Sequence, residues 1–373
     1  MRYAVVMAGG AGKRLWPASR QDRPKQLIEL VDGRCLLQLA LERLEGLFPP
    51  ERMMVVTSDA YADQVAECYP AMPRENIIGE PEGRDTANAI ALAAELLAAR
   101  DPDATMAVFT ADHIIRPKDV FQKAVETACR AAEEDPRALV IFGIRPTYPH
   151  TGLGYIHCKL DAAGGPSPVL GFKEKPERHL ARFYVESGDY FWNSGMFVWK
   201  VATILEALKT YLPESIKRLD PVGAAARVGQ DYSGQLRLIY PQLVKISIDV
   251  AVMEKTAPAL RENVPSADRE KAPHALMVEL NAQWLDVGSW PALDGVVEAD
   301  ADGNTVVASR AVLRDSSNNI VYSTGDHLIA VMGIDDSIIV HTPDATLVCD
   351  RNDSQRLKEL VDTVGKRFGK DYI

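Results

Sequence analysis

The stretch VVMAGGAGKRLWPASRQDRPKQ, residues 5–26, decides how the rest of the chain is interpreted. It begins with four apolar residues, which predict the end of a buried strand. A glycine-rich turn follows, and Pro17 and Pro24 exclude a regular helix through the segment. Glycines let a backbone approach a ligand closely, with N–H groups that can point at phosphate oxygens. We call residues 9–26 the glycine loop and expect it to bind phosphate groups.

The glycine loop matches neither of the two common glycine motifs. A P-loop needs GxxxxGK[ST], but here Gly12 and Lys13 are followed by Arg14. A dinucleotide fingerprint needs a third glycine at the position of Leu15. A plainer alternative is a glycine turn with solvated cations, which would account for an isolated GGxG but fits the whole string less well.

The candidate phosphate ligands of the loop are of three kinds. Arg14 can bind a triphosphate through two parallel hydrogen bonds from its guanidinium, and Lys25 can act as a point charge beside the phosphate oxygens. Lys13 can join them or remain a solvated cation. Backbone N–H groups come from the turn itself, at Gly9, Gly10 and Gly12.

The composition is that of an ordinary globular protein. The chain has 373 residues, of which 47% are hydrophobic and 25% charged. This length exceeds the usual limit of a single core, so we expect two domains, at residues 1–295 and 296–373. The net charge of −10 argues against nucleic acid as a partner, because nucleic-acid binding needs a basic face.

No segment predicts export or membrane insertion. The apolar run at the N-terminus is too short for a signal peptide, and no stretch approaches the roughly eighteen apolar residues of a membrane span. The five cysteines are scattered, odd in number and without a CxxC pair, so neither a disulfide framework nor a zinc site is indicated. We expect a cytoplasmic protein whose cysteines are small buried hydrophobic residues.

Strands and helices alternate through the first 145 residues, which predicts an α/β fold. The apolar strands show no period-two alternation, as expected when helices cover both faces of a mostly parallel, Rossmann-like sheet. Ligands of such sheets bind outside the carboxyl ends of the strands, where the glycine loop and Asp112 both lie. The expected strands are 3–8, 53–57, 76–79, 105–110 and 138–144, and the expected helices are 35–48, 61–68, 85–100 and 118–134.

The later part of the chain predicts more antiparallel and irregular structure. Residues 148–177 are typical of antiparallel strands, 193–200 of a turn into a strand, and 240–250 of an extended segment. After residue 294, short β segments recur between turn residues. They predict a small β-rich C-terminal domain, with a left-handed β-helix as one possibility, closed by an amphipathic helix over 355–368.

The glycine loop resembles the sequence signature of the sugar-phosphate nucleotidylyltransferase family. Its LWP and PKQ variants look like the mannose-1-phosphate guanylyltransferases (GDP-mannose pyrophosphorylases), in their short, single-function form. Further motifs follow in family order, over about residues 3–350: EPEGRDTANAI, TADH, GLGYI, FKEKP, WNSGMFVW, SIDVAVMEK and WLDVGSW.

The resemblance implies a reaction and a set of site residues. GTP and α-D-mannose 1-phosphate would give GDP-mannose and pyrophosphate, by in-line attack of the sugar phosphate on the α-phosphorus with Mg²⁺ present. It also implies a homodimer. The implied residues are catalytic Arg14, Lys25 and Lys175; nucleotide-binding Gly9, Gly10, Gly12, Lys13, Arg84, Thr86 and Asn88; sugar-phosphate-binding Gly154, Glu174 and Asn193; and metal-binding Asp112 and Asp286.

Each of these residues also has a structural interpretation when taken alone. An aspartate after a strand is more often a turn former than a ligand, and His113 beside it shapes the turn. Thr86 could cap a helix, Glu174 and Lys175 could be a surface charge pair, and Asn193 could be a turn residue. For the whole protein, the alternatives are a nucleotidylyltransferase for another base or sugar and a non-catalytic nucleotide-sugar sensor. A dehydrogenase is disfavoured because the third glycine is absent.

Overall fold

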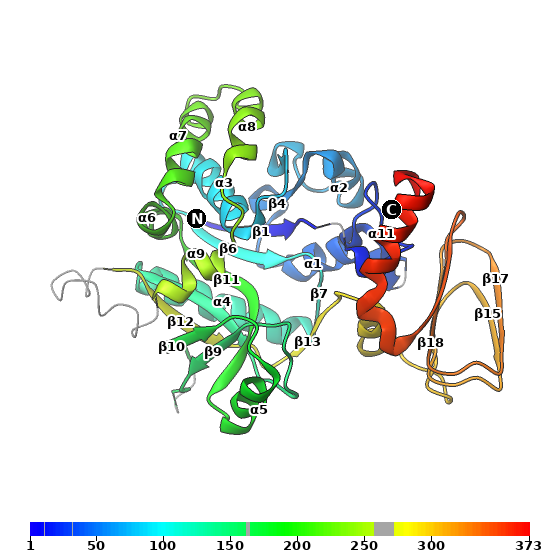
Figure 1. Ribbon diagram of the computed structural model, residues 1–373. Coiled ribbons are helices and arrows are strands. Elements are labelled where there is room, and N and C mark those ends of the chain that lie inside the picture. Colours follow the sequence, from blue (N-terminus) through cyan, green and yellow to red (C-terminus); the bar gives the residue numbers. More distant parts are fainter. Residues whose placement is uncertain (11, 32, 162–164, 257–271) are drawn as a thin grey trace.

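The computed structural model describes residues 1–10, 12–31, 33–161, 165–256 and 272–373. A central sheet of nine strands runs through the molecule in the order β5-β4-β1-β6-β11-β8-β12-β10-β9 (Figure 1). The strands are β1 (Arg2–Ala8), β4 (Met53–Ser58), β5 (Ile77–Glu80), β6 (Thr105–Thr110), β8 (Ala138–Ile144), β9 (Tyr155–Cys158), β10 (Ser167–Lys173), β11 (Tyr190–Lys200) and β12 (His274–Glu279).

The parallel arrangement predicted from the sequence is confirmed for the first half of the sheet. Strands β5, β4, β1 and β6 pair in parallel, and β12 pairs in parallel with β8. Between these two groups lies β11, which is antiparallel to both β6 and β8. A strand from the later part of the chain is therefore inserted beside β6, the strand that leads to Asp112.

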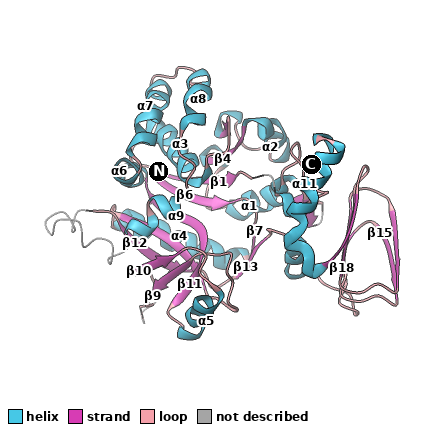
Figure 2. Cartoon of the chain, viewed as in Figure 1, coloured by secondary structure: helices cyan, strands magenta, loops and turns pink. Residues whose placement is uncertain are grey.

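Helices cover both faces of the sheet, as the unbroken apolar strands predict (Figure 2). Alternate residues of β1 enter different cores: Val5 lies in a core formed with α3 and α6, and Val6 lies in a core formed with α1 and α4. The helices are α1 (Leu36–Leu44), α2 (Ala62–Cys68), α3 (Asp85–Arg100), α4 (Lys118–Glu134), α5 (Arg178–Ser187), α6 (Val201–Tyr211), α7 (Pro213–Arg227), α8 (Ser233–Ile239), α9 (Ile248–Ala251) and α11 (Leu357–Phe368).

The C-terminal part is β-rich, as predicted. Its strands β14, β16 and β18 pair in parallel, β19 adds an antiparallel edge, and β15 pairs in parallel with β17. Parallel pairing of each short strand with the next but one is the arrangement of a coiled β structure, seen beside the red helix α11 in Figure 1. The bounds are β14 (Thr305–Val307), β15 (Arg310–Arg314), β16 (Ile320–Ser323), β17 (Leu328–Met332), β18 (Ser337–His341) and β19 (Thr346–Asp350).

A third core joins the glycine loop to the C-terminal part. Leu15 and Trp16 of the loop pack in one cluster with Trp290, Ile338 and Leu357. The domain boundary after residue 295 stays a prediction, and this shared core crosses it.

Two local predictions were wrong. Residues 240–250, predicted to be extended, contain a 3-10 turn at Tyr240–Gln242 and helix α9, whose N-cap Ser247 accepts a hydrogen bond from the Val250 N–H. Asn193 lies within β11 rather than in a turn before it. The pairing of β11 with β8 is irregular between Asn193 and Phe197, where Gly195 has φ +66°. A local bulge therefore replaces the expected turn.

None of the described helices is both long enough and apolar enough to cross a bilayer.

Candidate active site

The glycine loop leaves the carboxyl end of β1 and folds back on itself. Gly10 and Gly12 have φ values of +98° and +67°, a region that side chains other than glycine rarely adopt. A Cβ atom on Gly12 would lie 2.5 Å from the Cβ of Lys25. Gln26 Nε2 also donates to the Gly9 carbonyl at 2.5 Å. The glycine at position 12 therefore lets Lys25 pack directly against the turn.

Two carboxylates meet beyond the end of β6. Asp112 lies between β6 and β7 (His113–Arg116), and Asp286 ends β13 (Gln283–Asp286). Because β13 pairs antiparallel with β7, Asp286 lies opposite His113. One ligand atom from each of Asp112, His113 and Asp286 falls within 4.8 Å of the others. The structure thus brings the two predicted metal ligands together.

Lys25 forms an ion pair with Asp112 at the centre of this group. Burial would lower the pKa of Lys25, but Asp112 and Asp286 outweigh burial and the pKa is raised. Burial would likewise raise the pKa of Asp112, but the Lys25 ammonium holds it below its usual value. The ammonium occupies the position at which a cation would neutralise both carboxylates. Oxygen donors of this kind fit Mg²⁺, which takes one or two carboxylates together with phosphate oxygens.

His113 is held as a neutral, structural side chain. Burial lowers the pKa of its imidazole. Its Nδ1 atom lies 2.5 Å from Thr110 Oγ1 and accepts a hydrogen bond from Trp284 Nε1 at 3.2 Å. These contacts fit the prediction that His113 shapes the turn after β6.

The two adjacent cations of the loop point to different partners. Arg14 Nη1 donates to Gln355 Oε1 at 3.4 Å. A Cβ built on Gly288 would lie 3.8 Å from this nitrogen and 3.6 Å from Asp286 Oδ1, so Arg14 and Asp286 both border Gly288. Lys13 instead forms an ion pair of 2.8 Å with Asp362 on α11, and both side chains are about half exposed. Arg14, unlike Lys13, therefore lies on the side of the loop that faces Asp286.

A second group of polar side chains gathers at the ends of β9, β10 and β11. Asn193 donates its backbone N–H to the Gly154 carbonyl at 2.8 Å. A Cβ on Gly154 would meet Glu174 Oε2 at 2.7 Å, so the glycine leaves room for this carboxylate. Lys175 has φ +41°, and its Nζ lies 2.8 Å from Glu174 Oε1. Since β10 ends before them, the side chains of Glu174 and Lys175 turn to the same place, although strand alternation would separate them.

Sequence reasoning missed Asp249 in this second group. Asn193 Nδ2 donates to Asp249 Oδ1 at 2.6 Å. Burial raises the pKa of Asp249 to about 6, with a further contribution from Glu174. The motif SIDVAVMEK contains the residue, but no sequence pattern showed that it faces Asn193.

The two groups are joined through β11. A Cβ on Gly195 would lie 3.7 Å from Thr110 Cγ2, and Thr110 is the partner of His113. Trp192 also packs against Trp284, with ring centroids 6.3 Å apart. The insertion of β11 beside β6 therefore places the Asn193 group next to the carboxylate group.

The segment predicted to bind the nucleoside lies at the start of α3. Thr86 Oγ1 accepts a hydrogen bond from the Ile248 N–H at 2.9 Å, and Arg84 forms an ion pair of 2.8 Å with Glu82. Asn88 is fully buried, and its Nδ2 donates to the carbonyl oxygens of Arg84 and Val244. Asn88 thus packs α3 against the 240s segment, whereas Arg84 and Thr86 are half-buried.

Glu80 is a second residue that sequence reasoning left unassigned. It ends β5, is buried, and accepts a hydrogen bond from Tyr240 Oη at 2.5 Å through Oε1. Burial raises its pKa to about 7. Its Oε2 lies 3.9 Å from where a Cβ on Gly9 would be. A carboxyl group therefore borders the glycine turn on the side away from Asp112.

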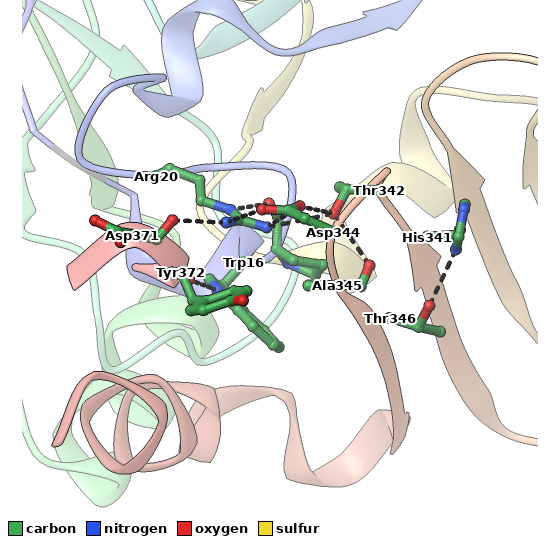
Figure 3. Close-up of polar contacts among 10 residues, drawn as sticks. Trp16, Arg20, His341, Thr342, Asp344, Ala345, Thr346, Asp371 and Tyr372 are labelled. Atoms are coloured by element: carbon green, nitrogen blue, oxygen red, sulfur yellow. Dashed lines mark hydrogen bonds and ion pairs between the residues drawn. The ribbon is translucent and has the colours of Figure 1, made fainter. Parts of the chain in front are cut away.

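The C-terminal residues hold the glycine loop in place (Figure 3). Trp16 Nε1 donates to the Tyr372 carbonyl at 2.6 Å. Arg20 forms two hydrogen bonds, of 2.8 and 2.7 Å, with the carboxylate of Asp344, and it donates to the Asp371 carbonyl at 3.2 Å. The sequence predicted no such contact, because these partners lie more than 300 residues further along the chain.

The fold and these two groups of residues define a class of protein. Residues 3–303 match the nucleotidyl transferase family, and residues 309–364 match a domain described as MannoseP isomerase/GMP-like beta-helix. The chain belongs to the nucleotidyl transferase family. The coiled β structure of the C-terminal part agrees with the second match.

Relatives that match the whole of this chain indicate a narrower class of enzyme. A Vibrio cholerae protein named putative mannose-1-phosphate guanylyltransferase is 38% identical over 100% of this chain and 76% of its own length. A Klebsiella pneumoniae mannose-1-phosphate guanylyltransferase has the same identity and coverage. A crystal structure from Thermus thermophilus, described as mannose-1-phosphate geranyltransferase, has a TM-score of 0.82 at 33% identity and covers 97% of this chain and 99% of its own. The predicted family is thus confirmed, and the chain is an enzyme of the mannose-1-phosphate guanylyltransferase class.

Proposed function

We propose that this enzyme joins GTP and α-D-mannose 1-phosphate to form GDP-mannose and pyrophosphate. The observation that carries the proposal is the meeting of Asp112, Asp286 and Lys25 beside the glycine turn. Phosphoryl transfer needs a phosphate-binding turn, a carboxylate pair and mobile cationic charge, since its catalysis is mostly positioning and charge neutralisation. The names of the relatives supply the base and the sugar.

Different residues of the site would bind the two substrates. The backbone of Gly9, Gly10 and Gly12, with Arg14 and Lys25, would hold the triphosphate. Lys175 would hold the sugar phosphate, and Glu174, Asn193 and Gly154 would bind or make room for the sugar. A phosphate oxygen of mannose 1-phosphate attacks the α-phosphorus, and the bond to the β-phosphate oxygen breaks, so that pyrophosphate leaves. No covalent enzyme intermediate is needed, because both substrates are held at once.

Asp112 and Asp286 would hold Mg²⁺, which supplies charge neutralisation at the phosphates when bound. Lys25 now forms an ion pair with Asp112. The same carboxylate would be a ligand of the ion, and in the substrate complex the Lys25 ammonium would bind a phosphate oxygen. Lys25 thus serves both as the partner of the carboxylate and as a phosphate ligand in this proposal.

Glu80 would select the base. An ionised carboxylate beside the glycine turn can accept hydrogen bonds from the two adjacent N–H groups of a guanine edge, which adenine and the pyrimidines do not offer in that form. Arg84 and Thr86 would lie near the ribose, and Asn88 would support them from within the core. Glu80→Gln should therefore lower kcat/KM for GTP by about tenfold or more, with a smaller effect for the other triphosphates.

One experiment tests the reaction directly. The protein is incubated with Mg²⁺, with mannose 1-phosphate or glucose 1-phosphate, and with each of the four ribonucleoside triphosphates in turn, and pyrophosphate release is measured. Release with GTP alone supports the proposal. Release only with another triphosphate would move the enzyme to another base, and release with glucose 1-phosphate but not mannose 1-phosphate would overturn the sugar assignment.

Three further parts of the proposal rest on the family resemblance and on composition. We propose a homodimer, a cytoplasmic location, and two units at residues 1–295 and 296–373. Light scattering at micromolar concentration gives the mass of the particle, and a monomer would contradict the dimer.

A further inference from the structure

Two cysteine thiols meet at the ends of two helices beside the glycine loop. Cys35 ends β3 (Arg34–Cys35) and is the N-cap of α1, and Cys68 is the last residue of α2. Their Sγ atoms are 2.8 Å apart, closer than the roughly 3.5–4.0 Å at which non-bonded heavy atoms normally sit. Both are free thiols in this structure. We propose that Cys35 and Cys68 form a reversible disulfide when the enzyme meets a peroxide.

The surroundings of the pair allow an oxidant to reach it. A surface cleft of about 510 Å³ is lined by both cysteines and by polar side chains that include Gln38, Gln64 and Glu67. Cys35 is 6% exposed and Cys68 is partly exposed. A small, polar oxidant such as hydrogen peroxide fits this cleft. Cys35 belongs to the same hydrophobic core as Cys129, but Cys35 and Cys68 line the cleft whereas Cys129 and Cys158 do not.

The two thiols are chemically unequal. The hydrogen bond from Cys68 lowers the pKa of Cys35, and the Gln38 N–H, which donates to Cys35 Sγ at 3.4 Å at the N-terminus of α1, acts in the same direction. The pKa of each of the other four cysteines is raised: by the hydrogen bond to Cys35 for Cys68, and by burial for Cys129, Cys158 and Cys349. Since the thiolate is the nucleophile, Cys35 attacks first and Cys68 resolves the product.

The chemical steps balance with peroxide as the only co-reactant. The Cys35 thiolate attacks one peroxide oxygen, the O–O bond breaks, and the hydroxide that leaves takes up a proton to become water. Cys35 is then a sulfenic acid. The Cys68 sulfur attacks the Cys35 sulfur, the S–O bond breaks, and a second water leaves with the Cys68 proton. Two thiols are oxidised by two electrons, and the peroxide is reduced to two waters.

The disulfide would act on the part of the glycine loop that carries Lys25. The 3-10 turn Lys25–Leu27 packs against both α1 and α2. A covalent bond between the start of α1 and the end of α2 ties together the two helices that flank this turn. We therefore expect slower backbone amide exchange in residues 25–36 of the oxidised protein.

The test uses the full chain under native conditions. The reduced protein is treated with a small excess of hydrogen peroxide, the remaining thiols are alkylated, and the intact mass and the non-reduced peptides are measured. We expect protection of two of the five thiols, a mass loss of about 2 Da before alkylation, a Cys35–Cys68 peptide, and full reversal by dithiothreitol.

Three variants separate this pair from general oxidation. Cys68→Ser should stop the mass loss and leave Cys35 to oxidise further, with a gain in mass. Cys35→Ser keeps a good N-cap and should also abolish the bond. Cys349→Ser, which removes another partly exposed thiol, should behave as the parent does. A cross-link that survives Cys68→Ser, or a parent protein that only gains oxygen, would overturn the proposal. Unchanged exchange in residues 25–36 would overturn the link to the Lys25 turn.

Discussion

Arg20 holds the glycine loop against the C-terminal part, and its removal tests whether that contact positions the site. The guanidinium, 10% exposed, donates to both oxygens of Asp344, to Thr342 Oγ1 at 3.3 Å, and to the carbonyl oxygens of Pro17 and Asp371. Asp344 is 50% exposed. Arg20→Ala removes all of these contacts at once without adding a new side chain (Figure 3).

The size of the effect follows from exposure. Because Asp344 is half exposed, the ion pair contributes at most about 1 kcal/mol. The remaining hydrogen bonds are partly buried and together add about 1 kcal/mol after the loss of hydration. The free energy of docking the loop should therefore fall by about 2 kcal/mol, which is roughly thirtyfold in the equilibrium constant between the docked and the undocked loop. For a chain of this length, the same energy lowers the melting temperature by about 3 °C.

Steady-state kinetics and thermal unfolding measure the two consequences. We expect Arg20→Ala to raise KM for the nucleotide by three- to thirtyfold, as an order of magnitude, because the competent loop is less populated. The matched control is Arg23→Ala in the same loop, where the guanidinium is 41% exposed and lies 3.7 Å from Glu29. Its melting temperature should change by less than about 1 °C. If the two variants behave alike, the docking contact does not position the loop.

Three further predictions concern the site itself. Lys25→Ala should lower kcat by about a hundredfold with the fold intact by circular dichroism, and near-parental turnover would remove its assigned role. Asp112→Asn should raise the Mg²⁺ concentration needed for half-maximal rate by about tenfold or more, and an unchanged titration would refute the ligand assignment. The pKa of Asp249 is raised to about 6 in the folded protein, whereas an unfolded aspartate titrates near 4. Ionisation of Asp249 therefore lowers the free energy of unfolding, and this loss grows as the pH rises from about 4 to about 6. Asp249→Asn should therefore have a free energy of unfolding about 2 kcal/mol higher than the parent at pH 7.5, but not at pH 4. Its KM for the sugar phosphate should rise. If the variant and the parent are equally stable at both pH values, this reasoning is contradicted.

Most of the fold could be predicted from the sequence because it depends on local patterns. The Ala- and Leu-rich run 85–100 and the amphipathic run 118–134 correspond to α3 and α4. The apolar runs that carry β1, β4 and β6 predicted parallel strands with both faces covered. The prediction was wrong at residues 240–250. There α9 is held by a contact with α3 and the 3-10 turn by the bond from Tyr240 to Glu80, neither of which is visible in the local pattern.

The candidate site was only partly visible in the sequence. Asp112 could be placed at a strand end, but its meeting with Asp286 needs the β7–β13 pairing. Glu80 and Asp249 carry no local signal, and their raised pKa values arise from burial by distant segments. The Cys35–Cys68 contact was also unexpected, because scattered cysteines give no spacing from which to infer a pair.

The local order of residues is enough to predict a glycine turn that leaves a buried strand with cations close behind it. This prediction depends only on local properties of the chain: the backbone freedom of glycine, the positions of the prolines and the order of the residues. The partners of the turn depend on the tertiary structure, which places Lys25 beside Asp112, Arg14 beside Gln355, Lys13 beside α11 and Arg20 beside Asp344. These partners lie far along the chain, and the pairing of β13 with β7 and the packing of the C-terminal part on the loop bring them within reach.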